Sequence, residues 1–544
     1  MAGVAYARAW QRLVGLVRRR PAMAVLAACL AAQCAPLLIT RVLPFHDAPG
    51  VIGLAGAFAH LEDPVTRVRE FFDVDYGLYP SVAYFGWAWL AAQLHVPVDL
   101  AMNAFVALFC LLGPPLALLA LLRAFGRPGA LALLALPIGY HQQIWFGFLG
   151  SAAGITGLLL AMACARRLCD EPRLGPHLGL AAALLLAASC HPFSLALTLA
   201  VVAPVLVWPA AGETAVARLR VRALRVACFV PTAALLALWA RGFFGSGPAT
   251  GAVTGVLARE LRLHRPPLSE DLATFVEWLG GGYRGHVDDL VVLVGLAALV
   301  AFLALGLRAV SPGDGDRDEL TGRRWNAVWL GWAIAVLAAG YLFLPDKVYW
   351  PTYWWGVRVR CAAPLFLVAV ACVRPVRRGL PAWALAASAV TAACYAAYVG
   401  VDFQTHWKGR ALAGFDEAIA AIPPGQSLLA LPALPDPHYT RGHPYLGQYY
   451  VARTGGRATP YLLGHPGSYW VTMKPPPASP PWGDPAQFVW NVHGLGYDYF
   501  LLERPPATDV HDPFAELPRG AVTLVSSRGA WRLYRRERPP LPGE

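Results

Sequence analysis

The chain has 544 residues, of which 57% are hydrophobic and only 14% charged, and its formal net charge is +12. Apolar runs of about 18 residues or more, long enough to span a bilayer, recur along it, so we expect a mainly α, polytopic helical membrane protein and exclude a soluble protein with amphipathic core helices. The positive charge lies mostly in short arginine clusters between apolar runs, which fits the positive-inside bias and argues against nucleic-acid binding.

About eleven membrane spans are predicted. The first follows Arg18, Arg19 and Arg20 and lacks a small-residue cleavage site, so we expect an uncleaved span with the N-terminus in the cytoplasm. The predicted spans lie near residues 22–42, 100–122, 128–141, 147–165, 178–191, 193–209, 222–240, 288–307, 326–344, 359–373 and 381–400.

A large first external loop, 43–99, follows from the charge pattern. If the apolar segment 81–94 crossed the bilayer, every later arginine cluster would face outward. We therefore expect a helix lying on the outer surface there, with Tyr84, Trp87 and Trp89 at the membrane interface.

The composition changes after the last span, which divides the chain into a transmembrane domain, 1–402, and a tail, 403–544, rich in Pro, Tyr and His. The tail is predicted to be a small extracytoplasmic α/β domain. Its expected elements are a helix at 415–422, strands at 427–431 and 497–502, and a hairpin of 522–526 and 531–534.

Asp47 is the leading candidate for chemistry, because it follows the first span in the external loop. A carboxylate at the membrane surface can act as a general base on an acceptor or bind a divalent metal ion. Its neighbour His46 could serve as a second ligand or as an acid/base group. No other cofactor is indicated.

An anionic lipid headgroup is the ligand expected for Arg358 and Arg360, with Lys347 upstream, because guanidinium groups fork onto phosphate oxygens. The aromatic run 349–355, between Lys347 and Arg358, is typical of an interfacial aromatic belt; the alternative is a platform that stacks on sugar rings.

Further ionisable residues stand near the external ends of predicted spans or in the first loop. Such groups cost free energy in a bilayer and tend to be kept for function or pairing, although each one alone could simply cap a helix. They are His191, Asp73, Asp75, His286, Asp288 and Asp289.

In these features the chain resembles the GT-C superfamily of integral membrane glycosyltransferases, including the protein mannosyltransferase and lipid A aminoarabinose transferase groups. The family has a first span that ends at an acidic residue in a large external loop, followed by surface helices. The matching segments are Phe45–Pro49, the helix-like Val51–His60, Tyr79–Trp87 and Val96–Asp99.

The resemblance implies an inverting transferase that takes a sugar from a polyprenyl-phosphate donor at the external face of a bacterial-type inner membrane, with Asp47 as the catalytic carboxylate. The Asp-Glu pair often seen in the family is here His46-Asp47. Two other classes stay open: a transporter or flippase of lipid-linked oligosaccharide, and a non-catalytic assembly protein. Membrane lipid is an expected partner in all three.

Overall fold

The computed structural model describes most of the chain. The described residues are 20–74, 82–170, 173–208, 214–245, 268–308, 317–348, 354–373, 382–433, 436, 438–461, 470–504, 512–518 and 520–537.

A helix occupies each of the eleven predicted span positions, which confirms a mainly helical, multi-pass membrane protein. In the described residues, seven helical stretches are long and apolar enough to cross a bilayer: Pro21–Leu38, Val98–Ala124, Leu149–Asp170, Ala215–Trp239, Val287–Leu305, Arg324–Phe343 and Ala382–Ala411. The other four positions hold shorter helices, so the count of eleven spans stays a prediction. The helices are α2 (Pro21–Cys34), η1 (Ala35–Leu38), α6 (Val98–Phe105), η3 (Val106–Leu112), α7 (Gly113–Ala124), η4 (Gly129–Ile138), α9 (Leu149–Asp170), α10 (Leu174–Cys190), α11 (Pro192–Val202), α12 (Pro204–Val207), α13 (Ala215–Ala227), α14 (Val230–Gly245), α17 (Val287–Arg308), α18 (Arg317–Phe343), η5 (Arg358–Cys361), α19 (Ala362–Cys372), α20 (Ala382–Asp402) and η6 (Phe403–Ala411).

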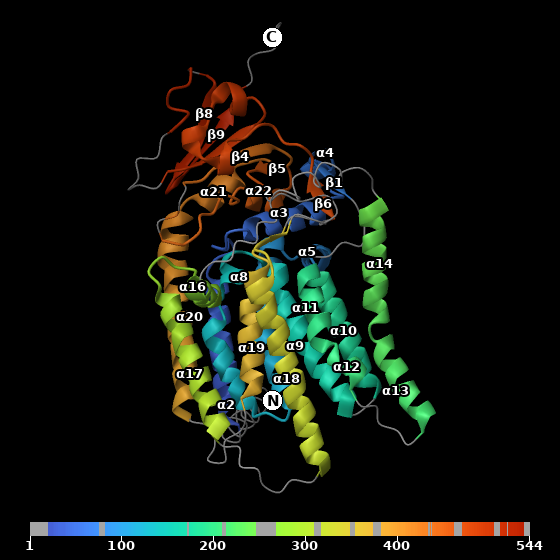
Figure 1. Cartoon of the computed structure of the whole chain (residues 1–544). Helices are drawn as coiled ribbons and strands as arrows, with labels where there is room; N and C mark the ends of the chain where they lie inside the picture. The colour runs from blue at the N-terminus through green and yellow to red at the C-terminus, as the bar shows by residue number, and fades with distance from the viewer. Residues whose placement is uncertain are drawn as a thin grey trace, which may run out of the picture.

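The first loop is built from short helices at one end of this bundle, and the tail packs on the same end (Figure 1). A helix is present where a surface helix is predicted, as α5, between the bundle and the tail. The elements of this end are α3 (Ala48–Ala59), η2 (Pro64–Thr66), α4 (Val68–Phe71), β1 (Phe72–Val74), α5 (Val82–Gln93), α8 (Gln142–Trp145), α16 (Leu268–Leu279), β2 (Lys347–Val348) and β3 (Trp354–Trp355).

The tail contains a five-stranded mixed sheet in the order β5-β4-β7-β9-β8, which places the predicted strands together with one that was not predicted, β5. β4 runs parallel to β5 and β7, and β8 and β9 form the predicted hairpin. The elements are α21 (Phe415–Ala420), β4 (Ser427–Leu431), α22 (Gln448–Thr454), β5 (Arg457–Thr459), β6 (Val471–Met473), η7 (Pro481–Gly483), η8 (Pro485–Gln487), η9 (Trp490–Gly494), β7 (Tyr499–Glu503), β8 (Val522–Arg528) and β9 (Trp531–Arg536).

The tail and the first loop share one hydrophobic core, to which Phe45, Ile52, Tyr450 and Trp531 all belong. Within this core α22 lies against α3, and β6 pairs with β1 of the first loop. The expected domain boundary at residue 402 falls inside a continuous helix, because α20 passes directly into η6. The tail and the transmembrane part are therefore joined by a continuous helix, and the core shared by the tail and the first loop forms a buried junction beside it.

Candidate functional site

Asp47 is held by its backbone at this junction, immediately before α3. The amide groups of His46 and Asp47 donate to the carbonyl oxygens of Trp145 and Phe146, over 2.9 and 3.0 Å. The turn that offers these carbonyls continues into Gly147, whose φ is +80° and whose missing side chain leaves room for the backbone nitrogens of Asp47 and Ala48. A glycine is thus required for the close approach that fixes Asp47.

The Asp47 carboxyl group is largely buried, with 18% of its side chain exposed. Burial raises its pKa to about 7, while the positive charges of Arg360 and Arg441 act in the opposite direction. The group is therefore poised to exchange a proton near neutral pH.

His46 lies beside this carboxyl group, with its Nε2 3.6 Å from Oδ1 of Asp47. Its Nδ1 is 2.6 Å from the carbonyl oxygen of Gly442, so Nδ1 carries the hydrogen and Nε2 carries the lone pair. Burial lowers the pKa of His46, and the charge of Arg441 lowers it further, which keeps the ring neutral at pH 7. In this tautomer the neutral imidazole lies beside the Asp47 carboxyl group without adding a positive charge to it.

Arg360 supplies one of the two nearby positive charges. It lies in η5, its side chain is buried, and it donates through Nη2 to the carbonyl oxygen of Trp355 over 2.9 Å. Its Nη1 lies 2.9 Å from Nε2 of His191, the residue between α10 and α11. The guanidinium also stacks over Phe148, 4.2 Å from the ring centre. These contacts fix the direction of the cation.

Arg441 supplies the second charge, and it comes from the tail. Its guanidinium lies over the rings of Phe146 and Trp355, at 4.8 and 5.9 Å from their centres. Tyr445, a few residues later, places its ring 6.0 Å from the ring of His46. Sequence reasoning missed both residues, because they lie almost 400 positions from Asp47; the run of polar and aromatic residues at 438–445 was the available signal.

Aromatic rings form a wall beside the two arginines. Phe146 packs against Trp355 at 4.5 Å and stacks on Trp278 at 5.9 Å between ring centres, and Phe148 stacks on Trp278 at 6.3 Å. An apolar, aromatic wall next to paired cations suits an amphiphilic ligand that has a charged head.

The other two cations expected at a phosphate site stand apart from this arrangement. Arg358 is paired with Asp271 over 2.5 Å and with Asp346 over 2.6 Å, so its guanidinium is already bonded to two carboxylates. Lys347, in β2, has an exposed side chain.

The remaining candidates divide between helix termini and the surface. Asp288 is buried and accepts the amide hydrogens of Gly282 and Tyr283, as expected of a residue that stabilises a turn. His286 is 81% exposed and pairs with Asp289 over 2.7 Å. Asp73, in β1, is 74% exposed and 3.8 Å from Lys474. Asp75 lies outside the described residues.

Asp47 and His46 together are a poor site for a divalent metal ion. Within the described part of the chain, no cluster of three or more His, Cys, Asp or Glu residues is suitably placed. Two guanidinium groups also act on the Asp47 carboxyl group, and they would repel a second cation. No step is therefore assigned to a metal.

The chain matches no protein-family model and no curated protein sequence. Among solved structures it is similar to ArnT from Cupriavidus metallidurans bound to undecaprenyl phosphate, with 14% identity, a TM-score of 0.52, and coverage of 94% of this chain and 97% of that one. The apo form of ArnT gives 13% identity and a TM-score of 0.50 over the same shares. Arabinofuranosyltransferase AftD from mycobacteria gives 14% identity and 0.44, over 97% of this chain and 42% of AftD. The two ArnT structures confirm the expected resemblance as a likeness of fold.

Proposed function

We propose that this chain is an inverting membrane glycosyltransferase that moves a sugar from a polyprenyl-phosphate donor to an acceptor at the external face of a bacterial-type inner membrane. The observation that carries the proposal is the largely buried Asp47, which lies under the influence of Arg360 and Arg441 where the bundle meets the tail. The fold supports it as well, since the similar ArnT structure holds undecaprenyl phosphate.

In the proposed reaction Asp47 is the general base. Its carboxylate takes the proton from the acceptor hydroxyl or amine while the acceptor oxygen or nitrogen forms a bond to the anomeric carbon of the sugar. The bond between the anomeric carbon and the phosphate oxygen breaks at the same time, and the phosphate leaves with the electron pair. The proton stays on Asp47, because its pKa of about 7 lies above the lowered pKa of His46.

The leaving phosphate gains negative charge in the transition state, and Arg360 and Arg441 are the groups proposed to stabilise it. Both cations are positioned by stacking on rings of the aromatic wall, so little reorganisation is needed when the charge develops. The sequence also suggested Arg358 and Lys347 for this role. Arg358 is bonded to two carboxylates, so we assign it to hold the structure around Arg360.

The test is turnover of polyprenyl-phosphate sugars by the purified, detergent-solubilised protein. Asp47→Asn and Arg360→Gln should each lower kcat/KM by about 100-fold or more, because a base or a transition-state contact is lost. Glu62→Gln is the matched control in the same loop, since Glu62 is 77% exposed and pairs only with Arg69 among the ion pairs described for it. Glu62→Gln should be as active as the wild type. Because no step is assigned to a metal, a chelator should leave the activity of both proteins unchanged.

Unchanged turnover in Asp47→Asn would refute the role of the base. If the folded wild type binds polyprenyl phosphate but turns over no donor, the transporter or assembly reading becomes the better one.

A further inference from the structure

One loop of the tail, residues 438–445, packs against the end of the membrane bundle, and we name it the docking loop. Tyr439 forms an isolated antiparallel bridge with Tyr283, and the amide of Thr440 donates to the carbonyl oxygen of Gly282 over 3.2 Å. Arg284 donates through Nε to the carbonyl oxygen of Tyr439 over 3.0 Å. The loop is therefore hydrogen-bonded along its first half to the segment that connects α16 and α17.

The buried carboxylate of Asp402 anchors the side chains of the same half of the loop, while Asp436 accepts the amide hydrogens of His438 and Tyr439 over 2.7 and 3.1 Å. Asp402 is the last residue of α20 and its side chain is 5% exposed. Its Oδ2 accepts the hydroxyl hydrogen of Tyr439 over 2.5 Å and that of Tyr283 over 3.3 Å. Its Oδ1 lies 2.5 Å from Nε2 of His438.

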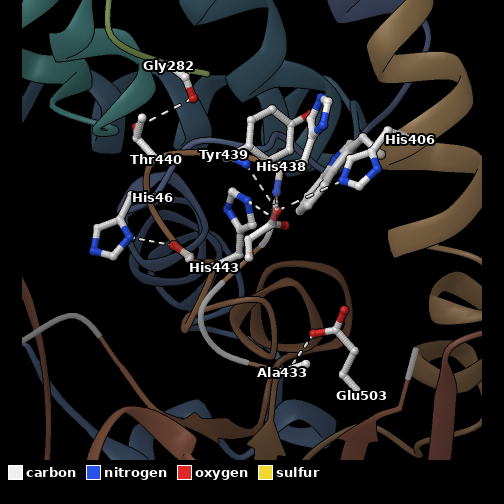
Figure 2. A network of polar contacts seen from close by, with 12 residues as sticks. His46, Gly282, His406, Ala433, His438, Tyr439, Thr440, His443 and Glu503 are labelled. Carbon is white, nitrogen blue, oxygen red and sulfur yellow. Dashed lines mark hydrogen bonds and ion pairs between the residues drawn. The ribbon is translucent and has the colours of Figure 1, made fainter. Parts of the chain in front are cut away.

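The second half of the docking loop meets the proposed catalytic pair. Gly442 accepts the hydrogen bond from Nδ1 of His46, and Arg441 acts electrostatically on both His46 and Asp47. Figure 2 shows His46 on one side of the loop, with His438, Tyr439 and His406 gathered on the other. One short loop thus connects Asp402 to Asp47.

We infer that Asp402 is a positioning residue for the proposed transfer, which holds the docking loop so that Arg441 stays beside Asp47 and the Gly442 carbonyl stays on His46. The inference rests on the proposed function for its catalytic meaning. Asp402, at the end of a membrane helix, would thus hold Arg441 of the tail in place, and Arg441 completes the proposed site.

The test compares variants of the anchor with matched variants elsewhere in the tail. Asp402→Asn removes the charge, and Tyr439→Phe removes only one hydroxyl group from the anchor. Asp512 is the matched control, because like Asp402 it accepts a tyrosine hydroxyl hydrogen, that of Tyr534 over 2.9 Å, and it accepts a second bond from Arg532 over 2.8 Å. Asp512→Asn and Tyr534→Phe therefore remove a carboxylate charge and a tyrosine hydroxyl from a site in the sheet of the tail.

The first readout is the pH dependence of kcat/KM in the full-length protein. Four ionisable groups act on or lie beside Asp47: Arg360, Arg441, His46 and Tyr445. Losing the charge of Arg441 raises the pKa of Asp47, so the acid limb of the profile should move to higher pH in Arg441→Gln, Asp402→Asn and Tyr439→Phe. In Asp402→Asn kcat should fall about tenfold or more, because a displaced cation no longer meets the leaving phosphate.

A double variant isolates the coupling between the two residues. Once Arg441 is replaced by Gln, replacing Asp402 as well should move the acid limb no further, because the charge that Asp402 positions is already gone. Additive shifts in the double variant, or an acid limb that moves equally in Asp512→Asn, would overturn the inference.

The second readout does not depend on turnover. Trypsin cleavage between Arg441 and Gly442, followed by mass spectrometry of the folded protein, should be faster by at least about tenfold in Asp402→Asn and Tyr439→Phe than in the wild type and the two controls. Equal cleavage in all five proteins would overturn the inference whatever the activity. If the wild type is inactive with every donor but cleavage is still faster in Asp402→Asn and Tyr439→Phe than in the other three proteins, the proposed function is refuted and the anchoring role of Asp402 is supported.

Discussion

Two opposing effects decide the behaviour of Asp47. Burial disfavours the carboxylate and two guanidinium charges favour it, and the balance raises the pKa from 3.8 to about 7. This difference corresponds to about 4 kcal/mol against the ionised form. Burial is therefore the larger effect, and the arginines keep the group from being permanently protonated.

The first prediction concerns pH. A base must be ionised, so kcat/KM of the wild type should rise with pH through about 7 and fall roughly tenfold for each pH unit below about 6. In Arg360→Gln the pKa of Asp47 should rise, because a neighbouring positive charge is lost, and the acid limb should move to higher pH. A rate profile recorded from pH 5 to about 9 measures both. An acid limb near pH 4 would contradict the burial argument.

The second prediction concerns Gly147. In Gly147→Ala, the new Cβ meets the backbone nitrogens of Asp47 and Ala48 at a position where φ is +80°. We expect kcat/KM to fall by about 100-fold through displacement of Asp47 and the free energy of unfolding to fall by about 1–3 kcal/mol. Gly126→Ala is the control, because its φ is +65° and its Cβ would meet nothing within 4 Å. It should lose stability and keep its activity; loss of activity in both variants would refute the argument.

At the scale of elements, the junction depends on how closely α3 and α22 approach. Gly53 and Gly56 of α3 face Gln448 and Ala452 of α22, and a Cβ on either glycine would collide with its neighbour. The segment Val51–His60 was expected to be helix-like from the family resemblance, and four of the five sheet strands were predicted from short strand-like runs. The sequence could not predict α22 or β5. The helix α22 is stabilised by packing on the distant α3, and β5 is defined by its pairing with β4.

The third prediction follows from this close approach. Gly56→Ala should lower the free energy of unfolding by about 1–3 kcal/mol, because the new methyl group meets the Ala452 backbone and the two helices must separate. Gly86→Ala, on α5, is the matched control, since its Cβ would meet nothing within 4 Å and alanine favours a helix by up to about 1 kcal/mol. Thermal unfolding in detergent measures the two changes, and a stabilised Gly56→Ala would contradict the packing argument.

The fourth prediction separates the two arginines of η5. Arg358→Met leaves Asp271 and Asp346 without their shared cation, and the pair Arg358–Asp271 is only 10% and 14% exposed. We expect the free energy of unfolding to fall by about 2 kcal/mol or more. Arg360→Met should instead cost more activity than stability, since the proposed role of Arg360 lies in the transition state. Stability and turnover measured on the same preparations decide this, and the reverse pattern would return Arg358 to the phosphate site.

At the scale of the whole molecule, the fold was more predictable than the site. Hydropathy along the chain is a local property, and it placed helices at all eleven expected positions. Asp47, His46 and Arg360 could be singled out because they stand at the ends of apolar runs. Arg441 and Asp402 could not, since their importance arises only when the docking loop folds back onto the bundle, a contact that no local pattern encodes.

The last prediction concerns the tail as a separate unit. Residues 412–544 carry the sheet, but the buried face of α22, with Tyr449, Tyr450 and Val451, belongs to the core shared with the first loop. Among the hydrogen bonds between residues 412–544 and the rest of the chain are those from the Leu43 amide to the Tyr449 hydroxyl over 2.8 Å and from the Trp531 indole to the Ala411 carbonyl over 2.7 Å.

Expressed alone, residues 412–544 would expose this apolar face to water, and we expect no cooperative thermal transition, in contrast to the full-length chain. Circular dichroism of the isolated tail, with the full-length protein in detergent as the control, measures this. A sharp transition in the isolated tail would mean that the sheet and its small second core, around Phe500 and Phe514, suffice for folding. The tail would then be a separate domain that docks onto the bundle, and Asp402 would carry a larger share of the contact that brings Arg441 to Asp47.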